Sequence, residues 1–205
     1  IELAIERVRR ATALQVPASG SIELAPGARI DQRFVPVSRA GVYIPGGKAV
    51  YPSSVVMNVV AAQVAGVSSI ALASPPQADS GGIHPTILAT ASLLGVDQLY
   101  QMGGAGAIGA LAYGVPDADL PPVDVVTGPG NKFVAEAKRQ VKGVVGIDSE
   151  AGPTEITVLA DHTAPAPFVA ADLISQAEHD ELAQAILVTT DSQLAADVAM
   201  FVEQM

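Results

Sequence analysis

The 205-residue sequence contains no cysteine, so it offers no thiol nucleophile, no thiolate metal ligand and no disulfide. The absence of cysteine fits a reducing cytosol. Aromatic residues make up only 4% of the chain and charged residues only 16%, against 49% hydrophobic residues. Such a composition excludes a disordered chain. An abundance of Ala, Val and Gly is typical of helices packed closely on a buried parallel sheet.

Long apolar runs are also missing, because no run reaches the roughly 18 residues that a membrane-spanning helix needs. We also expect no signal peptide at the start of the sequence. The formal net charge of −10 argues against a nucleic-acid partner, whose binding is driven by cationic side chains. We therefore expect a cytoplasmic protein that binds neither membrane nor nucleic acid.

Both ends of the sequence fall inside helical patterns. The first stripe of apolar residues consists of Ile1, Ile5 and Val8. The last stripe consists of Leu194, Val198, Phe201 and Met205, and no glycine or proline follows it. We expect the chain to be a piece of a longer protein.

A repeated pattern of strand, turn and helix fills the middle of the chain. Residues 61–76 and 90–105 each combine an Ala-rich helix end, a Gly-Val hinge and a short apolar strand. A third unit has a strand at 124–127, a turn at 128–131 and a helix at 132–141. Successive units of this size predict right-handed crossovers and a parallel sheet. By contrast, we expect residues 21–44 to form strands in an antiparallel or edge arrangement.

The predicted fold class is therefore α/β, with a doubly wound, Rossmann-like domain of mostly parallel strands and part of a second α/β domain. We assign residues 42–155 to the Rossmann-like domain. Residues 1–41 are assigned to the N-terminal part of the other α/β domain, and residues 156–205 to its continuation.

Three glycine-rich loops are expected at the carboxyl ends of strands, where open α/β sheets bind ligands. They begin at Tyr43, Gly103 and Gly128. The middle loop contains a G-x-G-x-x-G pattern that indicates either a dinucleotide site or tight helix packing. Its expected acidic partner, Asp124, starts a strand and so belongs to the wrong edge. The turn from Gly128 to Asn131 opens a helix, whose free amides attract phosphate or a polar group, although a simple capped turn is equally compatible.

Gln176 and His179 are three residues apart on a predicted helix and therefore share a face. An Ala-Gly-Pro-Thr-Glu turn precedes that helix in the sequence. The pair indicates a metal or substrate site, with a solvated surface histidine as the alternative. His84 and His162 are expected in a loop and a turn.

Several of these motifs together resemble a known family. Residues 147–155 and 172–179 closely resemble the signature of histidinol dehydrogenase, and the blocks at 41–47, 103–108 and 128–133 match the same family. The resemblance implies NAD-dependent and zinc-dependent oxidation of L-histidinol to L-histidine through the aldehyde, the last step of histidine biosynthesis. It further implies a homodimer whose small-molecule substrate is an amino alcohol.

By matching motif positions, the resemblance assigns substrate contacts to Thr154, Gln176 and His179. Gln176 and His179 are also the implied zinc ligands. Tyr43 and Asn131 are the implied NAD contacts. No catalytic residue is assigned within this chain, because the family's Glu-His proton-transfer pair and its remaining zinc ligands are expected beyond Met205.

One position departs from the family pattern. Gly106 stands where the family commonly has a glutamine that contacts NAD, and glycine has no side chain for that hydrogen bond. Two alternatives stay open beside the main interpretation. One is a related dehydrogenase of another amino- or sulfo-substituted alcohol, and the other is a non-catalytic α/β module that binds a nucleotide.

Overall fold

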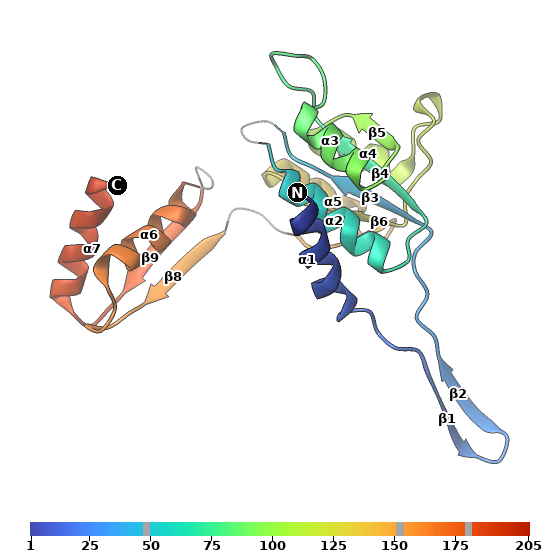
Figure 1. Ribbon diagram of the computed structural model, residues 1–205, viewed down its shortest axis with the longest axis horizontal. Coiled ribbons are helices and arrows are strands. Elements are labelled where there is room, and N and C mark those ends of the chain that lie inside the picture. Colours follow the sequence, from blue (N-terminus) through green and yellow to red (C-terminus); the bar gives the residue numbers. More distant parts are fainter. Residues whose placement is uncertain (47–49, 151–153, 179–181) are drawn as a thin grey trace. The chain divides into compact units, whose positions relative to one another are not determined.

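The computed structural model describes residues 1–46, 50–150, 154–178 and 182–205. The chain forms two compact units, Ile1–Glu150 and Ala151–Met205 (Figure 1). The assignment of residues 1–41 and 156–205 to one domain stays a prediction.

The first unit is built on a five-stranded parallel sheet with the order β5-β4-β3-β6-β7. Its strands are β3 (Arg39–Tyr43), β4 (Ser69–Ser74), β5 (Gln98–Gln101), β6 (Val125–Thr127) and β7 (Gly146–Ile147). The predicted doubly wound parallel sheet is confirmed. The expectation of an antiparallel or edge strand is wrong for β3, which is the central strand. Its residues from Ala40 to Tyr43 are buried, because helices cover both faces of the sheet there.

Each face of this sheet carries its own hydrophobic core. On one face, α2 (Pro52–Val64) and α3 (Pro85–Leu93) pack on Val42 and Leu72, with α1 (Glu2–Ala13) lying against α2. On the other face, α4 (Gly104–Tyr113) and α5 (Lys132–Val141) pack on alternate residues of the same strands. A short 3-10 helix, Pro116–Ala118, follows α4. None of the described helices is both long and apolar enough to cross a membrane.

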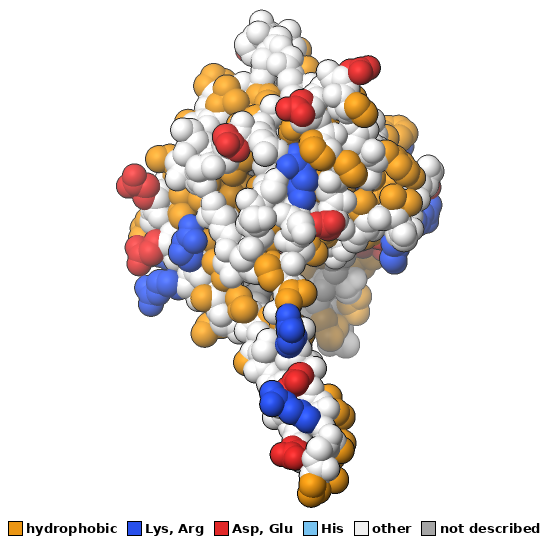
Figure 2. Space-filling model, turned by 90° about the vertical axis from the view of Figure 1, so that its right-hand side faces the viewer, with side chains coloured by type: hydrophobic (Ala, Val, Ile, Leu, Met, Phe, Trp, Pro, Cys, Tyr) orange, Lys and Arg blue, Asp and Glu red, His pale blue; other side chains and the backbone are white. Residues whose placement is uncertain are grey.

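Between α1 and β3 the chain forms an antiparallel hairpin of β1 (Gly20–Ala25) and β2 (Ala28–Gln32). The hairpin projects from the first unit as an arm, and every residue of its two strands is exposed (Figure 1). Ile22 pairs with Ile30 across the strands. Hydrophobic side chains gather along one side of the arm and charged ones along the other (Figure 2). The antiparallel arrangement expected for residues 21–44 is thus confirmed for this part.

The second unit is a smaller α/β element. Its parallel strands β8 (Glu155–Leu159) and β9 (Gln184–Val188) are joined by α6 (Ala166–Ala177) and followed by α7 (Ser192–Gln204). The helices cover one face of the strand pair through a core of Val169, Ala170, Leu194 and Val198. Alternate strand residues stay exposed. This arrangement confirms the expected part of a second α/β domain.

Candidate functional site

The strand order places a switch in chain direction at the carboxyl ends of β3 and β6. These neighbouring strands lead into helices on opposite faces of the sheet, since β3 continues to α2 and β6 continues to α5. In open α/β sheets, ligands bind outside the carboxyl ends of strands at such a switch in direction. The predicted NAD contacts Tyr43 and Asn131 both lie on segments that meet there.

Tyr43 ends β3 and holds two other segments in place. Its side chain is 4% exposed, and its hydroxyl accepts a hydrogen bond from the Gly104 N–H at 3.1 Å. The turn after β6 passes directly over its backbone, because a Cβ at Gly128 would lie 1.9 Å from the Tyr43 carbonyl oxygen. Gly128 also has φ of +114°, a conformation that favours glycine. The structure therefore brings Tyr43 and the turn after β6 together.

Asn131 is the N-cap of α5. Its Oδ1 accepts hydrogen bonds from the N–H groups of Phe133 and Val134, at 3.0 and 3.1 Å. The capped-turn interpretation is therefore confirmed, and Asn131 is also exposed at the start of the helix. Because Oδ1 is engaged in the cap, Nδ2 is the atom of this side chain suited to donate to a ligand.

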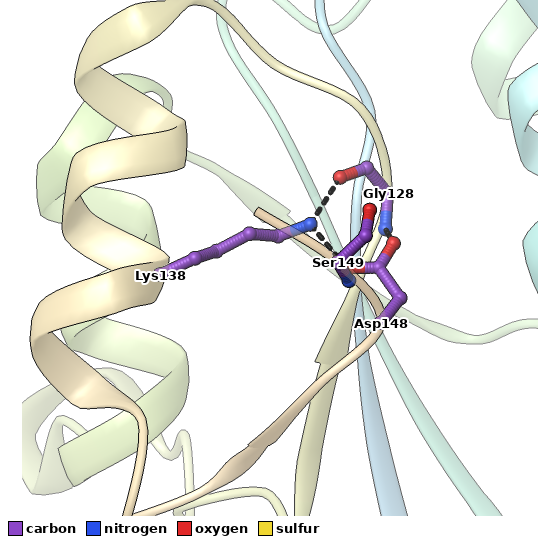
Figure 3. Close-up of polar contacts among 4 residues, drawn as sticks. All are labelled: Gly128, Lys138, Asp148 and Ser149. Atoms are coloured by element: carbon purple, nitrogen blue, oxygen red, sulfur yellow. Dashed lines mark hydrogen bonds and ion pairs between the residues drawn. The ribbon is translucent and has the colours of Figure 1, made fainter. Parts of the chain in front are cut away.

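An ion pair between buried Lys138 and the more exposed Asp148 fixes the same turn (Figure 3), and the sequence patterns did not single out this pairing. Lys138 of α5 is 3% exposed, and its Nζ donates to the Gly128 carbonyl at 2.6 Å and to Asp148 Oδ1 at 2.5 Å. The Gly128 N–H donates to Asp148 Oδ2 at 2.8 Å. The sequence did contain an indication of this pair, because Lys138 lies on the buried stripe of α5 between Val134 and Val141. A lysine on an apolar stripe needs a polar partner within reach.

The G-x-G-x-x-G segment has the context that the pattern requires, since α4 begins at Gly104 directly after β5. A Cβ at Gly106 or Gly109 would meet no atom within 4 Å, so close packing does not explain these two glycines. Asp124 precedes β6 and accepts a hydrogen bond from the Arg39 N–H at 2.8 Å. It therefore belongs to the amino edge of the sheet, as expected.

In the second unit, two of the predicted substrate contacts meet. Gln176 near the end of α6 donates from Nε2 to the backbone carbonyl of Thr154 at 3.0 Å, just before β8. This bond fixes the amide and leaves Oε1 as its metal-capable atom. His179 lies outside the described residues. Among the residues that the structure describes, no group of three His, Cys, Asp or Glu side chains could hold a metal ion.

The carboxyl edge of the second unit is open. A cavity of about 620 Å³ lies there, bordered by residues that follow β8 and β9. Asp161 lines it, and the Thr163 hydroxyl and N–H hydrogen-bond its carboxylate and lower its pKa. His162 is exposed in the same turn, as expected. His84 closes its loop as the N-cap of α3, with Nδ1 accepting from the Thr86 N–H.

All 205 residues match the family model for histidinol dehydrogenase. The chain belongs to the histidinol dehydrogenase family. Histidinol dehydrogenases of Leifsonia xyli and Corynebacterium glutamicum are 64% and 58% identical over 204 residues, which is 99% of this chain but 47% and 46% of theirs. The chain thus spans about half the length of the curated relatives it matches.

Solved structures give the same result. The crystal structure of histidinol dehydrogenase from Elizabethkingia anophelis matches the whole chain with a TM-score of 0.89 and 41% identity, and the match covers 47% of that protein. A propionaldehyde dehydrogenase from Clostridium phytofermentans matches with a TM-score of 0.55 at 13% identity, which is a likeness of fold alone. The resemblance read from the sequence motifs is therefore confirmed at the level of the family.

Proposed function

We propose that this chain forms part of an enzyme that oxidises L-histidinol to L-histidine through the aldehyde, with NAD and zinc as cofactors. The observation that carries the proposal is the match to the histidinol dehydrogenase family over all 205 residues. The substrate is then a small amino alcohol and the reaction closes histidine biosynthesis. A cytoplasmic homodimer completes the proposal.

For NAD, the residues at the carboxyl ends of β3 and β6 fit the cofactor. NAD supplies the hydride acceptor for both oxidation steps. The Gly128–Asn131 turn offers a side-chain donor at Asn131 and the start of α5, where a helix dipole favours a negatively charged group. Tyr43 is held beneath this turn by its contacts with Gly104 and Gly128. A role in binding NAD would explain why the Gly128–Asn131 turn lies so close to the backbone of Tyr43.

For zinc, the residues of this chain supply part of a site. Zinc would orient the amino and imidazole nitrogens of the substrate. Gln176 and His179 are the proposed ligands, and Thr154 is a proposed substrate contact through its hydroxyl. Catalytic zinc sites use three protein ligands or more, so further ligands must come from outside this pair. Gln176 fits a ligand role because its hydrogen bond to Thr154 holds the amide in one orientation.

The absence of cysteine from this chain bears on the second oxidation, from the aldehyde to L-histidine. No residue of this chain can form a thiohemiacetal, and the proposed nucleophile toward the aldehyde is a water molecule activated by a base. The Glu-His pair proposed to move these protons lies outside this chain.

A chimaera tests the proposal. Residues 1–205 replace the matching segment of the Leifsonia xyli histidinol dehydrogenase, which is 64% identical, and the unaltered relative is the control. We expect NAD reduction with L-histidinol at a rate within about tenfold of the control, together with loss of activity when a chelator removes zinc.

Substitution tests the assigned residues in the same chimaera. His179→Ala should lower both zinc content and turnover, and unchanged values would remove His179 from the site. A folded chimaera that oxidises other amino or sulfo alcohols but not histidinol would point to the related dehydrogenase. NAD binding without zinc-dependent turnover would point to the non-catalytic module.

A further inference from the structure

Lys138 is the one charged residue that is buried among the residues that the structure describes. Burying an ammonium group is costly even when it is paired, and its partner Asp148 keeps a side chain that is 34% exposed. An aliphatic residue at this point of the α5 stripe would continue the contacts of Val134 and Val141. Core stability alone therefore does not account for a lysine here.

The lysine and its partner act together on one peptide segment. Lys138 Nζ binds the carbonyl of Gly128 and Asp148 Oδ2 binds the N–H of Gly128, so one ion pair holds both polar groups of this residue (Figure 3). Asp148 Oδ1 also accepts the Ser149 N–H at 2.7 Å. The carboxylate thereby ties the segment after β7 to the turn after β6.

The Asn131 end of the turn is also held by hydrogen bonds to α5. Asn131 caps α5 through the Phe133 and Val134 N–H groups, while Lys138 reaches back from the middle of α5 to Gly128. Between these two ties lie only Pro129 and Gly130, and a Cβ at Gly130 would collide with Val134 at 2.3 Å. The backbone of the turn therefore has one position relative to α5.

We infer that Lys138 and Asp148 are positioning residues for the nicotinamide cofactor, which they serve by locking the Gly128–Asn131 turn before the cofactor arrives. This inference rests on the proposed function, since it takes NAD as the ligand of the turn. Neither side chain needs to touch NAD. Their effect is on affinity, because a turn already in its bound conformation loses less conformational entropy on binding.

Lys138→Met tests the inference in the chimaera, with Lys142→Met as the matched control. Lys142 lies at the end of the same helix, but it is exposed and pairs with Glu150 at 3.0 Å on the surface. Lys138→Met should raise the Kd for NAD roughly tenfold, the effect of losing one hydrogen bond to a charged group. The KM for NAD should rise in parallel while kcat at saturating NAD stays within about twofold. The control should leave all of these constants unchanged.

Backbone amide exchange gives a readout that is independent of turnover. In Lys138→Met without NAD, exchange in the peptide that contains Gly128 should accelerate, while exchange in β4 stays slow. A purely structural role predicts the opposite combination, with a lower melting temperature, unchanged Kd for NAD and unchanged exchange in the turn. That result overturns the inference.

The double substitution Lys138→Met with Asp148→Asn separates stability from positioning. Asp148→Asn alone leaves a buried lysine without its counter-charge and should lower the melting temperature most. The double variant should recover much of that stability, because no buried charge remains, yet bind NAD as weakly as Lys138→Met. Full recovery of NAD affinity would overturn the inference. Failure of the unsubstituted chimaera to bind NAD would instead overturn the proposed function.

Discussion

The two parallel sheets of this molecule differ in how they are covered. In the first unit, helices lie on both faces of five strands, and the central strand is buried on each face. In the second unit, helices cover one face of two strands, and Leu159 on the other face is 82% exposed. Parallel sheets are normally buried on both faces. The first unit therefore has a complete core, whereas the second presents a sheet that is only half covered.

The carboxyl edges of the two sheets differ in the same way. In the first unit, turns at this edge are in backbone contact, such as Gly128 over Tyr43. In the second unit, the edge borders a cavity of about 620 Å³. Turns in contact hold their backbone groups in fixed positions, which suits a cofactor with many polar atoms. Five tests, from the largest expected effect to the smallest, address this contrast.

Gly128→Ala should have the largest effect. The new Cβ would overlap the Tyr43 carbonyl at 1.9 Å, so the free energy of unfolding of the first unit should fall by about 4 kcal/mol or more. Urea unfolding measures this change. Gly143→Ala is the control, because its φ of +102° is similarly unfavourable but no atom lies within 4 Å of the added group. An equal loss in both variants would show that strain, and not the contact with Tyr43, limits position 128.

Leu72→Ala should come next. Leu72 is fully buried in β4, and removing its side chain should cost about 2–5 kcal/mol. Leu159→Ala on the open face of β8 should change the unfolding free energy by no more than about 0.5 kcal/mol. Denaturant melts of both variants give the comparison. A large loss at Leu159 would mean that this sheet face is covered in solution.

Helix caps allow a matched test of the two units. Asn131 caps α5 in the first unit, and Asp191 caps α7 in the second through the N–H groups of Gln193 and Leu194. Replacing either by alanine should cost about 1 kcal/mol. Each substitution should shift only the unfolding transition of its own unit, as followed by amide exchange. A shift of both transitions by either variant would show that the units unfold together.

Gly106→Ala should stabilise α4 by up to about 1 kcal/mol, because alanine is a better helix former and the added group meets no atom. Gly106→Gln should in addition lower the Kd for NAD, if this position contacts the cofactor as the family pattern implies. Gly109→Gln, on the same helix and equally open, is the control. Equal NAD affinity in both glutamine variants, measured by calorimetry, would remove position 106 from the cofactor site.

Thr163→Val should have the smallest effect. Loss of the hydroxyl bond should raise the pKa of Asp161 toward its ordinary value, as measured by carboxyl NMR. A lowered pKa stabilises the fold above the pKa of the unfolded state, and this contribution is lost as pH falls through the folded-state value. Thr163→Val should therefore reduce the acid resistance of the second unit slightly. Ser192→Val, next to the Asp191 cap, is the control and should leave the Asp161 pKa unchanged.

The sequence predicts the parallel sheet well because its strands and helices repeat in a regular order. The helix at 132–141 is an example, since Asn131 before it and the Lys142-Gly143 segment after it mark its ends in the sequence. The position of β3 could not be predicted in the same way. Its residues lie in the same stretch, 21–44, as the exposed hairpin, and only the helices that cover both of its faces distinguish it.

The candidate site was predictable as far as its motifs reach. Tyr43 and the turn after β6 were both expected at the carboxyl ends of strands, and the structure shows that these strands are neighbours and places the two segments in contact. The Lys138–Asp148 pair required three dimensions, because its partners are ten residues apart and meet only in the folded chain. Asp148 stands in the signature block 147–155 and Lys138 on the apolar stripe of α5, but neither position identifies the other as its partner.

The projecting hairpin has a consequence for solubility. Among the described strands, none pairs with either outer edge of the hairpin, and unpaired edges can accept an extended segment of another molecule. Glu23, Arg29 and Asp31 lie on the face of the ribbon opposite to Ile22 and Ile30, because alternate strand residues point to opposite faces. Charged side chains on edge strands disfavour the addition of further strands, so we expect these three residues to keep the arm from pairing with other copies.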